Sequence, residues 1–123
     1  MKVLHLDISL CGIDRILQGN KLREIREVRP KNRKYLLKSR NNKFIIDDNN
    51  RHIPKEYDAI MFHSNNNNLL IEVCNIYLKP VMADNGEQIK YLYKNEVIFA
   101  ESVVYELGRV IKCKVHRDKI KLL

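Results

Sequence analysis

The sequence predicts a small α+β, mainly β fold: a barrel of five to six mixed strands with one or two short helices. Three observations lead to this prediction. The chain has 123 residues, 45% of them hydrophobic, which suits a single packed domain over residues 1–123. Its apolar segments are short and separated by clusters of Asn, Gly and Pro. Helical patterns do not alternate regularly with strands, as a parallel sheet would require.

Six segments have the composition and the period-two alternation of short strands. In chain order they are residues 3–9, 21–29, 57–63, 69–78, 96–107 and 109–116. Pro30 ends the second of them, because proline cannot donate to a strand ladder. The asparagines at 65–68 suit a turn, and Gly108 predicts a bend or bulge between the last two strands. The turn-rich stretches, residues 39–56 and 79–95, are expected to be irregular.

A short helix is expected between the first two strands. Ile13, Ile16 and Leu17 recur at the spacing of one helical face. Ser9 is placed to cap the first turn, and Gly19 is placed to end the helix in a left-handed conformation. With about two turns, such a helix depends on packing for its stability.

The net charge of +8 is concentrated in one segment, residues 21–43. This segment holds two acidic residues and ten basic ones, among them Arg29, Arg33 and Lys34, and its residues 31–38 predict a short basic helix. The rest of the chain has 13 basic and 13 acidic residues. A field this localised attracts polyanions, of which nucleic acid is the commonest. The alternative is a well-solvated surface without a partner.

The strand at 21–29 has too polar a face for a plain core. Glu24 and Arg26 share one side of it, with about 7 Å between their Cα atoms. In a cleft, the arginine fork suits phosphate or carboxylate, and the glutamate accepts hydrogen bonds from a base. The alternative role for the two is an ion pair that fixes the strand.

The segment Gly19-Asn20-Lys21-Leu22-Arg23-Glu24-Ile25-Arg26 resembles the Gly-x-Lys-x-x-Glu-x-Arg signature of the ASCH domain family. Residues 56–62 are similar to a Tyr-Asp-x-Ile-x-Phe strand of bacterial and phage members, and residues 104–111 are similar to their closing strand. The resemblance implies a PUA-like barrel with a cleft beside the signature strand. It also implies RNA or nucleotide binding, with Lys21, Glu24 and Arg26 at the cleft.

One branch of that family consists of small amidohydrolases that act on N4-acetylcytidine. The resemblance implies Lys21 as a reactive residue of such an enzyme, whereas the branch has threonine at the position of Glu24. The amidohydrolase hypothesis takes Lys21 and Glu24 as the reactive pair. Amidohydrolase activity and the binding of RNA or a nucleotide are therefore alternative hypotheses. A third hypothesis is an interaction protein whose cleft is empty.

Three further side-chain groups are candidates for ligand contact. Lys21 would be a base or nucleophile if desolvated, and otherwise part of the basic surface. His63 is suited to acid–base work or to stacking on a base, or is simply solvated at a strand end. Tyr35, Tyr91 and Tyr93 are suited to stacking on single-stranded bases. Tyr91 and Tyr93 would share a face if extended, and core packing is their expected role.

The sequence contains no signal for other function classes. It has neither an apolar run long enough to span a membrane nor the apolar region of a signal peptide, so we expect a cytoplasmic protein. The three cysteines and four histidines lack metal-ligand spacing, and we expect neither a metal nor another cofactor. The oligomeric state does not follow from the sequence.

Overall fold

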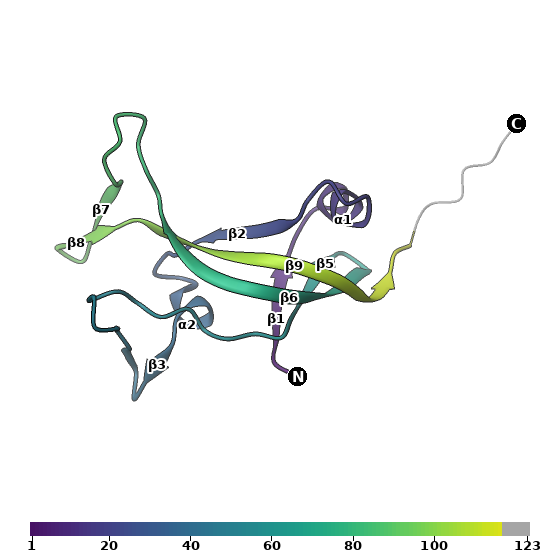
Figure 1. The fold of residues 1–123 in the computed structure, drawn as a ribbon, viewed down its shortest axis with the longest axis horizontal. Coiled ribbons are helices and arrows are strands. Elements are labelled where there is room, and N and C mark those ends of the chain that lie inside the picture. Colours follow the sequence, from purple (N-terminus) through teal and green to yellow (C-terminus); the bar gives the residue numbers. More distant parts are fainter. Residues whose placement is uncertain (117–123) are drawn as a thin grey trace, which may run out of the picture. The chain divides into compact units, whose positions relative to one another are not determined.

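The structure of the protein, a computed structural model, describes residues 1–116. These residues form nine strands: β1 (Val3–Asp7), β2 (Arg23–Glu27), β3 (Ser39–Arg40), β4 (Lys43–Phe44), β5 (Ala59–Ser64), β6 (Asn67–Pro80), β7 (Lys90–Tyr93), β8 (Glu96–Phe99) and β9 (Glu101–Lys114). The two helices are α1 (Leu10–Leu17) and α2 (Arg33–Leu36) (Figure 1). The predicted class, mainly β with mixed strands and two short helices, is confirmed.

Five strands are hydrogen-bonded in the order β1-β5-β6-β9-β2. The sheet is mixed, since β1 and β5 are parallel whereas β5–β6 and β2–β9 are antiparallel. Two further ladders, β3–β4 and β7–β8, form separate hairpins. The chain divides into two compact units. Among the described residues, unit 1 comprises residues 1–22, 57–74 and 107–116, and unit 2 comprises residues 23–56 and 75–106, so the long strands β6 and β9 each belong to both.

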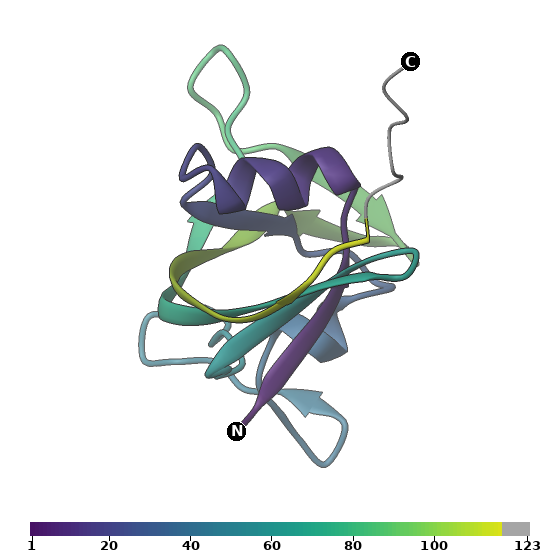
Figure 2. The same cartoon turned by 90° about the vertical axis from the view of Figure 1, so that its right-hand side faces the viewer.

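Unit 1 is built around β1, β5 and α1. The chain passes from β1 into α1 (Figure 2). Helix α1 packs against β5. The Ser9 hydroxyl accepts a hydrogen bond from the Gly12 amide at 3.0 Å, and Gly19 has a φ of +76°, so both predicted ends of the helix are confirmed. The buried apolar side chains of this unit are Leu4, Ile13, Ile16, Ala59, Ile60, Phe62, Leu69 and Ile71.

Unit 2 has its own buried apolar residues: Leu36, Leu37, Ala100, Val103, Val104 and Tyr105. Its two hairpins each turn through two residues with positive φ. Asn41 and Asn42 join β3 to β4, and Lys94 and Asn95 join β7 to β8. Two consecutive left-handed residues are typical of the tight turn whose twist matches that of paired strands.

Three predictions about strand boundaries were wrong. The turn after β5 uses only Asn65 and Asn66, because Asn67 and Asn68 already pair with β5 as part of β6. The stretch 79–95, expected to be irregular, contains β7. The last two strands divide at Ala100 and not at Gly108.

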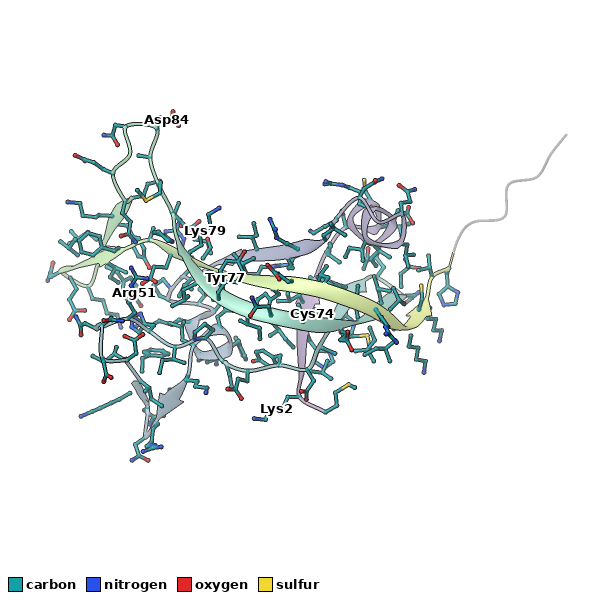
Figure 3. The ribbon with its side chains drawn as sticks, in the orientation of Figure 1. Lys2, Arg51, Cys74, Tyr77, Lys79 and Asp84 are labelled. Carbon is teal, nitrogen blue, oxygen red and sulfur yellow. The ribbon has the colours of Figure 1, made fainter. Side chains whose placement is uncertain are left out.

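Gly108 lies inside the continuous strand β9, where it allows side chains of the adjacent strand β6 to come close to its backbone. A Cβ atom at this position would lie 2.5 Å from Glu72 Oε1 and 2.6 Å from Cys74 Sγ (Cys74 is labelled in Figure 3). Real Cβ atoms do not come this close to other heavy atoms. The glycine therefore makes room for the side chains of the neighbouring strand.

Candidate nucleic-acid interface

Glu24 and Arg26, predicted to share a face of β2, are joined by an ion pair in unit 2. Arg26 Nε donates to Glu24 Oε1 at 2.9 Å. Glu24 is buried, with 5% of its surface exposed, while about a third of the Arg26 side chain reaches solvent. A charged hydrogen bond in a low-dielectric setting is short and strong, so the pair fixes this side of the strand.

The chain leaves β2 through a tight turn that is held by Asn32. The Asn32 side chain accepts from the Arg29 amide at 2.8 Å and donates to the Glu27 carbonyl at 3.0 Å. Pro30 restricts the backbone between them. The turn therefore presents Arg29 and Lys31 from a fixed backbone.

Arg29 lies against an aromatic ring from a distant part of the sequence. Its guanidinium carbon is 4.9 Å from the centre of the Tyr91 ring, and its Nη2 is 2.6 Å from Glu27 Oε1. Beside this contact is a hollow of about 550 Å³, which is lined by Arg29, Pro30, Lys31, Tyr91 and Tyr93. Both tyrosines are half-buried whereas Leu92 between them is exposed, so they share one face of β7.

The other two predicted basic residues, Arg33 and Lys34, lie on α2 and contact aromatic rings as well. The Arg33 guanidinium carbon is 5.0 Å from the centre of the Phe44 ring, and Lys34 Nζ is 4.9 Å from the centre of the Tyr35 ring. Such contacts align cations with ring faces and leave other faces of the cation available to an anion.

Two smaller hollows adjoin the same residues. A cavity of about 30 Å³ is lined by polar Arg33, His52 and Glu101 and by apolar groups that include Tyr91. A hollow of about 200 Å³ shares Leu78, Phe99 and Glu101 with it and is lined further by Asn50, Arg51, Pro80 and Gln88. Because Tyr91 also lines the 550 Å³ hollow, the three depressions adjoin one another through common side chains.

The two remaining predicted residues, Lys21 and His63, belong to unit 1. The Lys21 amide donates to the Arg15 carbonyl at 3.2 Å, and the residue is half-buried. His63 Nε2 lies 2.8 Å from His5 Nδ1, and His63 Nδ1 lies 2.9 Å from Asn68 Oδ1. His63 is thus part of a hydrogen-bonded row across three strands. Lys21 therefore lies in a different unit from Glu24 and Arg26.

Unit 1 also contains a tyrosine with a perturbed hydroxyl. Burial raises the pKa of Tyr57 above its ordinary value of 10.0, because burial disfavours the charged phenolate. In residues 1–116, no group of three or more His, Cys, Asp or Glu side chains is arranged to hold a metal ion. Cys11, Cys74 and Cys113 are exposed and do not form disulfides.

Sequence reasoning singled out Tyr91 and Tyr93 but preferred core packing for them, whereas both are half-buried and line the 550 Å³ hollow. The signal was the alternation of Tyr91, Leu92 and Tyr93, which predicts a shared face only where the segment is a strand. Comparisons of the chain with family models, with curated proteins and with solved structures find no match. None of the described helices is both long enough and apolar enough to cross a membrane.

Proposed function

We propose that the protein binds single-stranded nucleic acid, with RNA as the expected form, through the aromatic–basic surface of unit 2. This surface consists of Arg29, Lys31, Arg33, Lys34, Tyr91 and Tyr93. The single observation that carries the proposal is the Arg29–Tyr91 contact at the edge of the 550 Å³ hollow. This contact places a guanidinium, which suits phosphate, next to an aromatic ring, which suits the stacking of a base.

The chemistry of the hollow suits an unpaired nucleotide. Proteins that bind single strands combine a positively charged groove with aromatic side chains on which bases stack. Tyr91 and Tyr93 offer two rings on one face of β7, and Arg29 and Lys31 offer the charge. An arginine held over a tyrosine is also oriented, so its fork gives up less conformational entropy when it meets a phosphate.

Two other features support a polyanionic ligand and RNA in particular. The whole net charge of the protein is accounted for by residues 21–43, most of which belong to unit 2. The resemblance of residues 19–26 to the ASCH signature implies RNA, and unpaired bases in RNA loops and ends are the usual targets of sequence-reading proteins.

The first test is the salt dependence of binding to a labelled single-stranded RNA of about ten nucleotides. Fluorescence anisotropy between about 50 and 200 mM salt should give a linear fall of log K with log salt. The triple variant Arg29→Ala, Arg33→Ala, Lys34→Ala should weaken binding and reduce the slope by about 0.7 for each phosphate that the variant no longer neutralises.

The matched control removes three exposed lysines of unit 1, at Lys2, Lys112 and Lys114, and so makes the same change in net charge. If affinity and slope fall equally in both triple variants, only net charge attracts the RNA and the proposed surface is wrong. Unchanged binding in the first variant also contradicts the proposal.

The second test concerns stacking. Tyr91→Ala should weaken binding by about 1–3 kcal/mol, the cost of removing the ring under one stacked base, with little change in the salt slope. Tyr77→Ala is the control, because Tyr77 is a half-buried tyrosine of unit 2 that lines none of the three hollows. Equal effects of the two substitutions would contradict a stacking role for Tyr91.

The amidohydrolase hypothesis remains a prediction from the resemblance. Incubation of the purified protein with a panel of N4-acylated cytidines tests it directly. Release of the acyl group that is abolished by Lys21→Ala would support the hypothesis, and the absence of turnover on every member would remove it.

A further inference from the structure

Glu101, at the start of β9, is a carboxylate held in place beside two hollows of unit 2. Its carbonyl accepts from the Val28 amide at 2.8 Å. The residue before it, Ala100, is fully buried. The Ala100 amide donates a hydrogen bond to the Ile89 carbonyl at 2.7 Å, and the Ala100 carbonyl accepts one from the Val81 amide at 2.9 Å. The backbone that carries the Glu101 side chain is therefore anchored on both sides.

The Glu101 carboxylate has acceptor capacity that the described residues leave unused. The ionic contact of this carboxylate among residues 1–116 is with His52, whose Nδ1 is 3.8 Å from Oε1, too far for a hydrogen bond. An ionised carboxylate offers about four acceptor positions on two oxygens. With a quarter of its side chain exposed, Glu101 lines both the 30 Å³ cavity and the 200 Å³ hollow.

The 200 Å³ hollow has walls that suit one flat heterocycle. Leu78, Pro80 and Phe99 supply apolar surface. The Phe99 side chain is 54% exposed, with Lys90 Nζ 5.8 Å from the centre of its ring, which leaves aromatic surface on which a base can stack. Arg51 (labelled in Figure 3) supplies a cation at the same hollow. The volume lies below the roughly 300–1,000 Å³ of a drug-sized pocket, which fits a single base and not a larger ligand.

A carboxylate distinguishes guanine from the other ordinary bases. The pairing edge of guanine presents two parallel donors, the ring N1–H and the exocyclic amino group, which match the two oxygens of a carboxylate. Uracil presents one N–H between two carbonyl acceptors. Cytosine and adenine present an amino donor beside a ring nitrogen acceptor, whose lone pair would face the second carboxylate oxygen.

We propose that Glu101 makes the 200 Å³ hollow a guanine-reading subsite. In this subsite the base stacks on Phe99 and donates its N1–H and amino group to the carboxylate. The proposal rests on the proposed nucleic-acid function and extends it from backbone and stacking contacts to sequence preference. The same chemistry would recognise a guanine in RNA or in a free nucleotide, and the experiment separates the two sources.

The experiment uses uridine oligomers of about ten nucleotides with one central guanosine, adenosine, cytidine or inosine. The guanosine oligomer should bind roughly 5- to 150-fold more tightly than the all-uridine oligomer, the range for one bidentate base contact. Inosine, which lacks the amino group, should lose most of that preference. A 7-deazaguanosine oligomer, altered only at a position that the carboxylate does not contact, should keep it.

Glu101→Gln replaces one acceptor by a donor at constant size, and should bring the guanosine oligomer down to the affinity of the adenosine oligomer. Glu96→Gln is the matched control, because Glu96 is an exposed residue of unit 2 that lines none of the hollows. It makes the same charge change and should keep the preference. Circular dichroism spectra that match the parent protein confirm that both variants are folded.

The outcomes separate the two proposals. Oligomers that bind equally well whatever their central base overturn the guanine subsite and leave the proposed function standing. If none of the oligomers binds, a titration with guanosine monophosphate decides. If guanosine monophosphate binds and Glu101→Gln abolishes that binding, the result supports the subsite and contradicts the nucleic-acid function. If guanosine monophosphate does not bind, both proposals are overturned.

Discussion

At the scale of single residues, the fold places charged side chains in defined partnerships. The Glu24–Arg26 pair could be predicted, because residues two apart on a strand share a face and the sequence identifies the strand. The contact of Arg29 with Tyr91 could not, because it joins the end of β2 to β7 and depends on tertiary packing. Sequence periodicity predicts local geometry, and it does not predict contacts between residues that are far apart in the sequence.

Gly19 provides a prediction at this scale. Its φ of +76° is in the left-handed region, and a Cβ atom there would meet nothing within 4 Å, so the conformation alone opposes substitution. We expect Gly19→Ala to lower the free energy of unfolding in urea by about 1 kcal/mol. Gly19→Asn should cost less, because asparagine tolerates this conformation. Equal costs for the two variants would mean that side-chain contacts, and not backbone conformation, determine the effect.

At the scale of secondary structure, the four consecutive asparagines illustrate how far composition can mislead. Asn65 has a φ of +53° and belongs to the turn, as the sequence predicts. Asn67 is instead buried in β6, where its side chain donates to the Ser64 carbonyl at 3.0 Å and accepts from the His116 amide at 2.6 Å. The residue type predicted a turn, but satisfied hydrogen bonds allow an asparagine to enter a buried strand.

Asn67 and Asn66 accordingly differ in their expected tolerance to substitution. Asn67→Ala removes the hydrogen bonds that the buried Asn67 side chain makes with the Ser64 carbonyl and the His116 amide, and should destabilise the protein by about 1–3 kcal/mol. Asn66→Ala, at an exposed turn position, should change stability by no more than about 0.5 kcal/mol. Thermal and urea unfolding of the two variants would measure this difference, and similar values would contradict it.

At the scale of the whole molecule, the sequence predicted one domain, and the contacts divide the chain into two units with separate buried residues. The class of fold could be predicted from strand-like segments without alternating helices. The division could not, because β6 and β9 each contribute to both units and nothing in their sequences marks where one ends. Composition identifies strands, whereas only tertiary contacts assign parts of a strand to different cores.

Because β6 and β9 continue through both units, we expect the protein to unfold in one cooperative transition. Phe62→Ala in unit 1 should cost about 3–5 kcal/mol and Leu36→Ala in unit 2 about 2–5 kcal/mol, each lowering the midpoint of that same transition. Leu92→Ala, at a side chain that is 70% exposed, is the control and should have little effect. Two separate transitions in either core variant would show that the units unfold independently.

The hairpin β7–β8 has a consequence for how the protein can change. Tyr91, Tyr93 and Phe99 all lie on it, and its ladder is separate from that of the five-stranded sheet. Residues 90–99 can therefore be exchanged for another sequence without removing a ladder hydrogen bond of that sheet. The hairpin can in this sense be exchanged as a unit. Under the proposed function, replacing or randomising residues 90–99 would change which ligand is bound, while the sequences of the basic segment and of both cores stay the same.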